Sequence, residues 1–99
     1  MKINWTPKAK KTFEHILDWL SKNWTNKETE NFLDQTESTI NQIKNNPYMY
    51  RASVQNEQIR RGLINRFISL YYRVRPKKEE IDLLTFWDNR QNPDNNRYD

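Results

Sequence analysis

The chain has 99 residues, of which 34% are hydrophobic and 13% aromatic, with 17 Lys and Arg against 13 Asp and Glu. Cysteine is absent, which excludes disulfides, thiol nucleophiles and thiolate metal sites, and no apolar run approaches the ~18 residues needed to span a bilayer. We expect a single domain over 1–99 in the cytoplasm, without a signal peptide, a metal or a cofactor.

The first half of the chain predicts a short strand over 2–6 and a helical hairpin over 7–45. Thr6 and Pro7 are typical of a helix start, as N-cap and first-turn residue. The helical pattern is interrupted at 23–26, where Thr25 or Asn26 is the expected N-cap of the second helix. Apolar residues at helical spacing mark both helices. The stripes are Ala9, Phe13, Ile16, Leu17, Leu20 and Trp24, then Thr29, Phe32, Leu33, Thr36, Ile40 and Ile43.

The second half predicts three antiparallel strands within 59–87. Asn46-Pro47 ends the second helix, because the residue before proline disfavours α geometry. Strands follow over 59–64, 67–74 and 81–87, with Asn65-Arg66 as a tight hairpin link and an irregular tail over 88–99. The predicted fold is α+β, in the order β-α-α-β-β-β. The helical hairpin packs on one face of a small, mostly antiparallel sheet.

Basic residues are concentrated between Gln58 and Lys78, where no acidic residue occurs. Strand alternation places Ile68, Leu70, Tyr72 and Val74 under the helices, and Phe67, Ser69, Tyr71 and Arg73 on the other face. Arg60 or Arg61 of the neighbouring strand then lies beside Arg73, with Tyr71 between them. Guanidinium groups bind phosphate bidentately, and tyrosine offers a stacking surface for a base. The segment therefore indicates a surface for an anionic partner.

Other interpretations of the same residues stay open. The arginines can be solvated or paired with the acids of 79–88, and Tyr71 can simply cover the sheet. His15 lies on the polar face of the first helix and is typical of a surface histidine. A metal-free ribonuclease would need cationic and proton-transferring groups such as Arg61, Arg73, Arg90 and Tyr98, whose mutual geometry the sequence does not give.

The order and spacing of several short segments resemble one known superfamily. These segments are Trp5-Thr6-Pro7-Lys8-Ala9, the helical hairpin with Pro47 after it, Ile59-Arg60-Arg61, Leu70-Tyr71-Tyr72-Arg73-Val74, and 81–86 followed by Asn89-Arg90-Gln91-Asn92-Pro93. Over roughly 2–93 the chain is similar to the RelE/ParE superfamily of toxins from type II toxin–antitoxin modules.

The resemblance implies a toxin held inactive by a cognate acidic antitoxin, encoded by a short adjacent reading frame. RelE-like members cut mRNA in the ribosomal A site, whereas ParE-like members inhibit DNA gyrase and lack that catalytic set. By resemblance, the second-strand arginine falls on Arg60 or Arg61, the arginine after the last strand on Arg90, and the C-terminal tyrosine on Tyr98. Many relatives carry a histidine just after the last strand, where this chain has Trp87 and Asp88.

We therefore favour a ribosome-dependent mRNA endonuclease whose partners are the antitoxin, the ribosome and mRNA. Its predicted catalytic residues are Arg61, Arg90 and Tyr98. Its predicted RNA- or target-binding residues are Arg60, Arg61, Arg66, Tyr71, Arg73, Arg75, Lys77 and Lys78. A ParE-like, non-enzymatic inhibitor of DNA gyrase is the first alternative, and a non-toxic basic nucleic-acid-binding module is the second.

Overall fold

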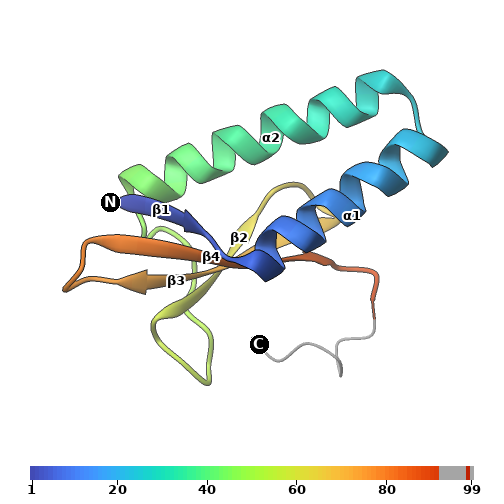
Figure 1. The fold of residues 1–99 in the computed structure, drawn as a ribbon. Coiled ribbons are helices and arrows are strands. Elements are labelled where there is room, and N and C mark those ends of the chain that lie inside the picture. The colour runs from blue at the N-terminus through green and yellow to red at the C-terminus, as the bar shows by residue number, and fades with distance from the viewer. Residues whose placement is uncertain (92–97, 99) are drawn as a thin grey trace.

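The computed structural model describes residues 1–91 and 98 and has an α+β fold (Figure 1). The elements are β1 (Lys2–Trp5), α1 (Pro7–Asn23), α2 (Asn26–Asn45), β2 (Ile59–Leu63), β3 (Ile68–Arg75) and β4 (Glu80–Asp88). The sheet order is β1-β4-β3-β2, with β1 parallel to β4 and the other pairs antiparallel. Both helices lie on the same side of the sheet (Figure 1). The predicted fold class and element order are confirmed.

Threonine side chains cap the N-termini of both helices. Thr6 Oγ1 accepts a hydrogen bond from the backbone N of Ala9 (3.1 Å), and Thr25 Oγ1 accepts one from the backbone N of Glu28 (3.3 Å). Thr25 rather than Asn26 is therefore the second cap. Thr6 Oγ1 also donates to the carbonyl of Leu83 (2.7 Å), which fixes the start of α1 against β4.

The core lies between the helices and one face of the sheet. Ile68, Leu70, Tyr72 and Val74 are all buried there, which confirms the predicted inner face of β3. Two residues of the predicted stripes are exposed instead: Leu33 (42%) and Trp24 (51%). Leu33 lies about 100° around α2 from the buried Phe32, at the margin of the stripe. Trp24 is the extended C-cap of α1, so helical spacing no longer applies to it.

The strand connections differ from the prediction in two places. Asn65 Oδ1 accepts from the backbone N of Phe67 (2.8 Å) and of Ile68 (3.0 Å), so the β2–β3 link is longer than Asn65-Arg66, and β3 begins at Ile68. In β4, Thr85 pairs with Tyr71 but Leu83 pairs with Tyr72, which leaves Leu84 as a bulge. The extra residue lets Leu83 and Phe86 both face the core.

The predicted tail over 88–99 lies mostly outside the described residues. Asp88 ends β4 rather than beginning the tail, and residues 89–91 form a turn. Among the described residues, neither helix carries the long apolar stretch that crossing a membrane requires.

Candidate functional site

The sheet face turned away from the helices, called here the open face, carries Arg61, Tyr71 and Arg73. Strand pairing puts Arg61 opposite Tyr71 and Arg60 opposite the core residue Tyr72. Arg61 is therefore the arginine that joins Tyr71 and Arg73, which resolves the one-residue ambiguity of the sequence. Arg60 lies on the helix side instead. Its guanidinium covers the ring of Tyr48 (5.0 Å) and donates to the carbonyl of Tyr50 (2.6 Å).

A polar network holds the side chain of Arg61 on the open face. Its Nε donates to Ser69 Oγ (2.9 Å), and its Nη2 donates to Asn89 Oδ1 (2.8 Å). Asn89 Oδ1 also accepts from Ser69 Oγ (2.9 Å). The backbone N of Asn89 donates to the carbonyl of Phe67 (2.7 Å). The residue after β4 thus fixes the direction of a β2 arginine.

Tyr71 does not offer the stacking surface that the sequence suggested. Only 1% of it is exposed, and its ring stacks on that of Tyr98 with centroids 5.3 Å apart. Lys8 Nζ lies 3.5 Å from the Tyr98 hydroxyl. Tyr98 does come to the same face as Arg61, but it covers Tyr71 against any incoming base.

The remaining basic residues of 58–78 are distributed over several surfaces. Arg75 pairs with Asp82, with 2.7 Å between Nε and Oδ2, and Arg66 lies over the ring of Phe67 (4.6 Å) in the β2–β3 link. Lys77 and Lys78 are exposed in the β3–β4 turn. The predicted single basic patch is therefore divided: Arg61 and Arg73 lie on the open face with Lys77 and Lys78 in the turn at its end, whereas Arg60 and Arg66 lie elsewhere.

Arg90 lies on the opposite side of the sheet from Arg61. Asp88 pairs with Ile68, whose side chain faces the helices. Arg90 donates two hydrogen bonds to the Asp88 carboxylate, from Nε (3.0 Å) and from Nη2 (2.7 Å). The guanidinium of Arg90 also lies 5.5 Å from the ring centroid of Trp19 on α1 and 5.3 Å from that of Phe67. The hydrogen bond from Arg90 holds the pKa of the Asp88 carboxyl below its usual value.

The Asp88–Arg90 pair predicts a specific pH dependence of stability. Because the folded-state pKa of Asp88 is lowered, its contribution is present above the unfolded-state pKa of about 4 and is lost as pH falls through the folded-state pKa. We expect the free energy of unfolding to fall less steeply between pH 5 and 2 in Asp88→Asn than in the unmodified chain. Urea unfolding across this pH range measures the free energy of unfolding. Parallel curves of that free energy against pH for the two proteins would contradict a stabilising Asp88–Arg90 pair.

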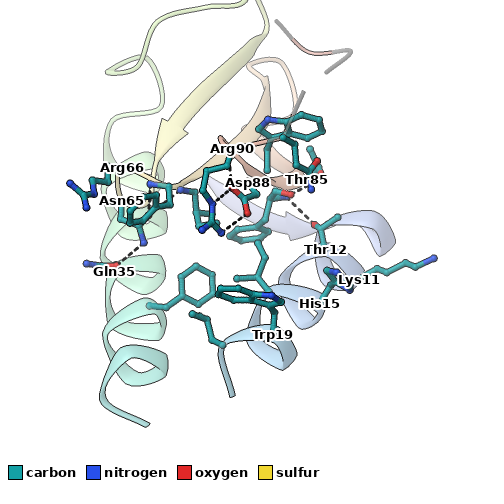
Figure 2. Close-up of a pocket in the computed structure, with 18 of the residues that line it drawn as sticks. Lys11, Thr12, His15, Trp19, Gln35, Asn65, Arg66, Thr85, Asp88 and Arg90 are labelled. Carbon is teal, nitrogen blue, oxygen red and sulfur yellow. Dashed lines mark hydrogen bonds and ion pairs between the residues drawn. The ribbon is translucent and has the colours of Figure 1, made fainter. Parts of the chain in front are cut away.

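A groove of about 1230 Å³ opens between the helices, the β2–β3 link and the end of β4 (Figure 2). Its apolar lining includes Ile16, Leu20 and the buried Phe32, together with three exposed aromatic residues: Trp19 (41%), Trp24 (51%) and Phe67 (39%). Its charged lining is mainly basic. It consists of Lys8, Lys11, Arg66 and Arg90 against Glu28 and the Arg90-bound Asp88. The sequence indicated grooves beside the helices as one possible antitoxin contact but not the residues that line this one, although a tryptophan at 19, outside the first stripe, is a usable signal.

The groove walls are fixed by polar contacts between distant segments. Thr12 Oγ1 on α1 accepts from the backbone N of Phe86 on β4 (2.9 Å), and Asn65 Nδ2 donates to Gln35 Oε1 on α2 (3.1 Å). His15 lines the same groove. In the part of the chain that the structure describes, no group of three or more His, Asp or Glu could hold a metal ion.

Comparison with known proteins gives the family of this fold. The family model described as the ParE toxin of the type II toxin–antitoxin system parDE matches residues 3–93. The chain belongs to the ParE toxin family. It is therefore the toxin of a type II toxin–antitoxin system, and its partner is a cognate antitoxin.

Two solved structures have the same fold as this ParE-family chain. One is described as the chromosomal ParDE toxin–antitoxin system from P. aeruginosa, with a TM-score of 0.71, 17% identity, and coverage of 89% of this chain and 95% of that one. The other is a copper-bound mutant toxin from Helicobacter pylori, with a TM-score of 0.56, 17% identity, and coverage of 90% of this chain and 94% of that one. A search of curated proteins finds no match.

Proposed function

We propose that this ParE-family toxin inhibits DNA gyrase by binding it and does not cut RNA. ParE-like members of the superfamily inhibit gyrase, whereas RelE-like members need a catalytic set around one phosphate. The observation that carries the proposal is that Arg61 and Arg90 point to opposite sides of the sheet. Two arginines placed in this way do not stabilise charge on the same phosphate.

The groups available for proton transfer support the same conclusion. RNA cleavage needs a proton acceptor and a proton donor within hydrogen-bond reach of the reacting phosphodiester. Trp87 and Asp88 are the positions nearest to the histidine that many relatives carry, and both oxygens of Asp88 bind Arg90. Tyr98 is stacked on the buried Tyr71, and His15 lies in the groove on the helix side. Among the residues that the structure describes, Asp88 and His15 are therefore not placed beside Arg61, and the proton-transferring group on its face is the stacked Tyr98, with Lys8 Nζ 3.5 Å from its hydroxyl.

The groove between the helices and β4 fits the antitoxin. Its apolar lining with exposed Trp19, Trp24 and Phe67 provides pockets for apolar side chains, and Lys11 and Arg66 provide positive charge beside them. An acidic, amphipathic segment matches this combination through a helix-in-groove contact. The groove lies mainly on the helix side and extends round the edge of β4 to Tyr98, whereas Arg61 and Arg73 do not line it, so we assign the groove and these two arginines to different partners.

The test is inhibition of purified gyrase by purified toxin. We expect DNA supercoiling to stop as toxin is added and to recover when the antitoxin is premixed with it. Tyr98→Phe is the discriminating variant, because it keeps the stack on Tyr71 and removes only the hydroxyl. We expect it to inhibit gyrase and arrest growth as the unmodified toxin does, whereas loss of a proton-transferring group lowers a nuclease rate about 10²–10⁴-fold. Normal supercoiling at saturating toxin would rule out the proposal.

A further inference from the structure

One end of the open face carries a cluster of exposed cations from three elements, called here the basic end: Lys2, Arg73, Lys77 and Lys78. Lys2 begins β1, Arg73 lies near the end of β3, and the two other lysines lie in the β3–β4 turn. The backbone N of Lys2 donates to the carbonyl of Glu79 (3.0 Å) in that turn, so the turn and the N-terminus lie side by side (Figure 1).

The neighbouring acids Asp82 and Glu80 do not neutralise the basic end, because their carboxylates bind other side chains of the sheet. Asp82 is buried, pairs with Arg75 (2.7 Å) and accepts from Asn4 Nδ2 (3.1 Å). Glu80 is half-buried and also accepts from Asn4 Nδ2 (3.3 Å). Among the described residues, no ion pair involves a cation of the basic end. The exposed acid beside them is Glu79.

We infer that the basic end binds the phosphate backbone of double-stranded DNA, so that the toxin contacts the DNA held by its target. This inference rests on the proposed function, since gyrase works on bound DNA. Neutralising phosphates requires exposed cations and releases counterions, with no need for apolar contact. Like charges gathered on one surface repel each other until such a polyanion compensates them.

The chemistry of the basic end favours DNA over an acidic peptide. Peptide recognition depends on large side chains buried in pockets, and a charged rim alone contributes little to affinity. The exposed large hydrophobic residues of the described chain belong to neither β1, β3 nor the β3–β4 turn: Trp19, Trp24, Leu33, Tyr48, Met49, Val54, Leu63 and Phe67. The basic end also lies outside the groove assigned to the antitoxin.

The experiment measures binding of the full toxin to a short, fluorescently labelled duplex of mixed sequence over a range of salt concentrations. We expect Lys77→Ala/Lys78→Ala to bind several-fold more weakly at low salt. Its slope of log affinity against log salt should be smaller by about 1.8, because each lost phosphate contact removes about 0.9. Lys10→Ala/Lys27→Ala removes the same charge from exposed positions on the helices and should keep the slope of the unmodified toxin.

Three results would overturn the inference: an unchanged slope in Lys77→Ala/Lys78→Ala, an equal loss in the helix control, or tighter binding of a polyglutamate peptide than of the duplex. The supercoiling assay on the same proteins separates this inference from the gyrase proposal. DNA binding through Lys77 and Lys78 without gyrase inhibition would remove the gyrase proposal and leave the DNA assignment. Gyrase inhibition with no DNA binding would overturn the DNA assignment and leave the gyrase proposal.

Discussion

Replacing Ile43 by alanine is expected to lower the free energy of unfolding by about 2–5 kcal/mol. Ile43 is fully buried and joins α2 to the sheet above Gly62 on β2. The other buried side chains of α2 are Phe32, Thr36 and Thr39, so Ile43 provides the aliphatic packing beside Gly62. Urea unfolding followed by far-UV circular dichroism measures the change.

Gly62 provides the matched test of this packing. A Cβ at position 62 would lie 3.1 Å from Ile43 Cδ1 and 3.5 Å from Tyr50 Cε2, so Gly62→Ala overpacks the core and should destabilise it by about 1 kcal/mol. In the Ile43→Ala background the added methyl group fills part of the cavity, and we expect Gly62→Ala to be neutral or stabilising there. The two effects should therefore couple by about 1 kcal/mol or more, whereas additive effects would contradict the close approach.

Replacing Trp19 by alanine is expected to weaken antitoxin binding by about 2 kcal/mol or more, which is about 30-fold in Kd. Trp19 is 41% exposed in the groove and its ring contacts the Arg90 guanidinium, so the change removes both apolar surface and one of the contacts of Arg90. Isothermal titration of toxin with the product of the short acidic reading frame expected beside its gene measures the loss.

Leu33→Ala is the control for this prediction. Leu33 is 42% exposed and apolar like Trp19, but it does not line the groove. Antitoxin affinity should stay within about threefold of that of the unmodified toxin, because isolated surface apolar residues contribute little to binding. Equal losses in both variants, or no loss in Trp19→Ala, would place the antitoxin elsewhere on the toxin.

Much of the fold could be predicted because local sequence and tertiary packing agree. The Thr6 cap, the Pro7 first turn and the apolar spacing of α1 specify one helix start in any environment. The alternation of Ile68, Leu70, Tyr72 and Val74 matches the period of a strand with one buried face. Where these signals were strong, the structure differs from the prediction only at the ends of elements, as at Ile68, where β3 begins, and Asp88, where β4 ends.

The candidate site could be predicted less well, because it depends on contacts between distant residues. The register that separates Arg60 from Arg61 depends on a link longer than the two predicted residues. The burial of Tyr71 depends on Tyr98, which is far along the chain. Arg90 is bound by Asp88, two residues away, but its direction toward Trp19 follows from the face that Asp88 occupies in β4.

The structure also changes the interpretation of positive charge in this chain. The sequence suggested one binding patch, and the structure distributes its arginines so that Arg75 is paired with Asp82 and Arg60 lies against Tyr48. Arg61 and Arg73 remain on the open face, and the groove receives Arg66 and Arg90. A toxin with two separate basic surfaces can contact its target and its antitoxin through different residues.

The most direct measurement is a map of mRNA 5′ ends across the transcriptome within minutes of inducing the toxin, with antitoxin-repressed cells as reference. Our account predicts no new ends within codons, together with relaxation of plasmid supercoiling in the same cells. New cuts at ribosome-bound codons that disappear in Arg61→Ala would show that the open face is a nuclease site and would contradict it.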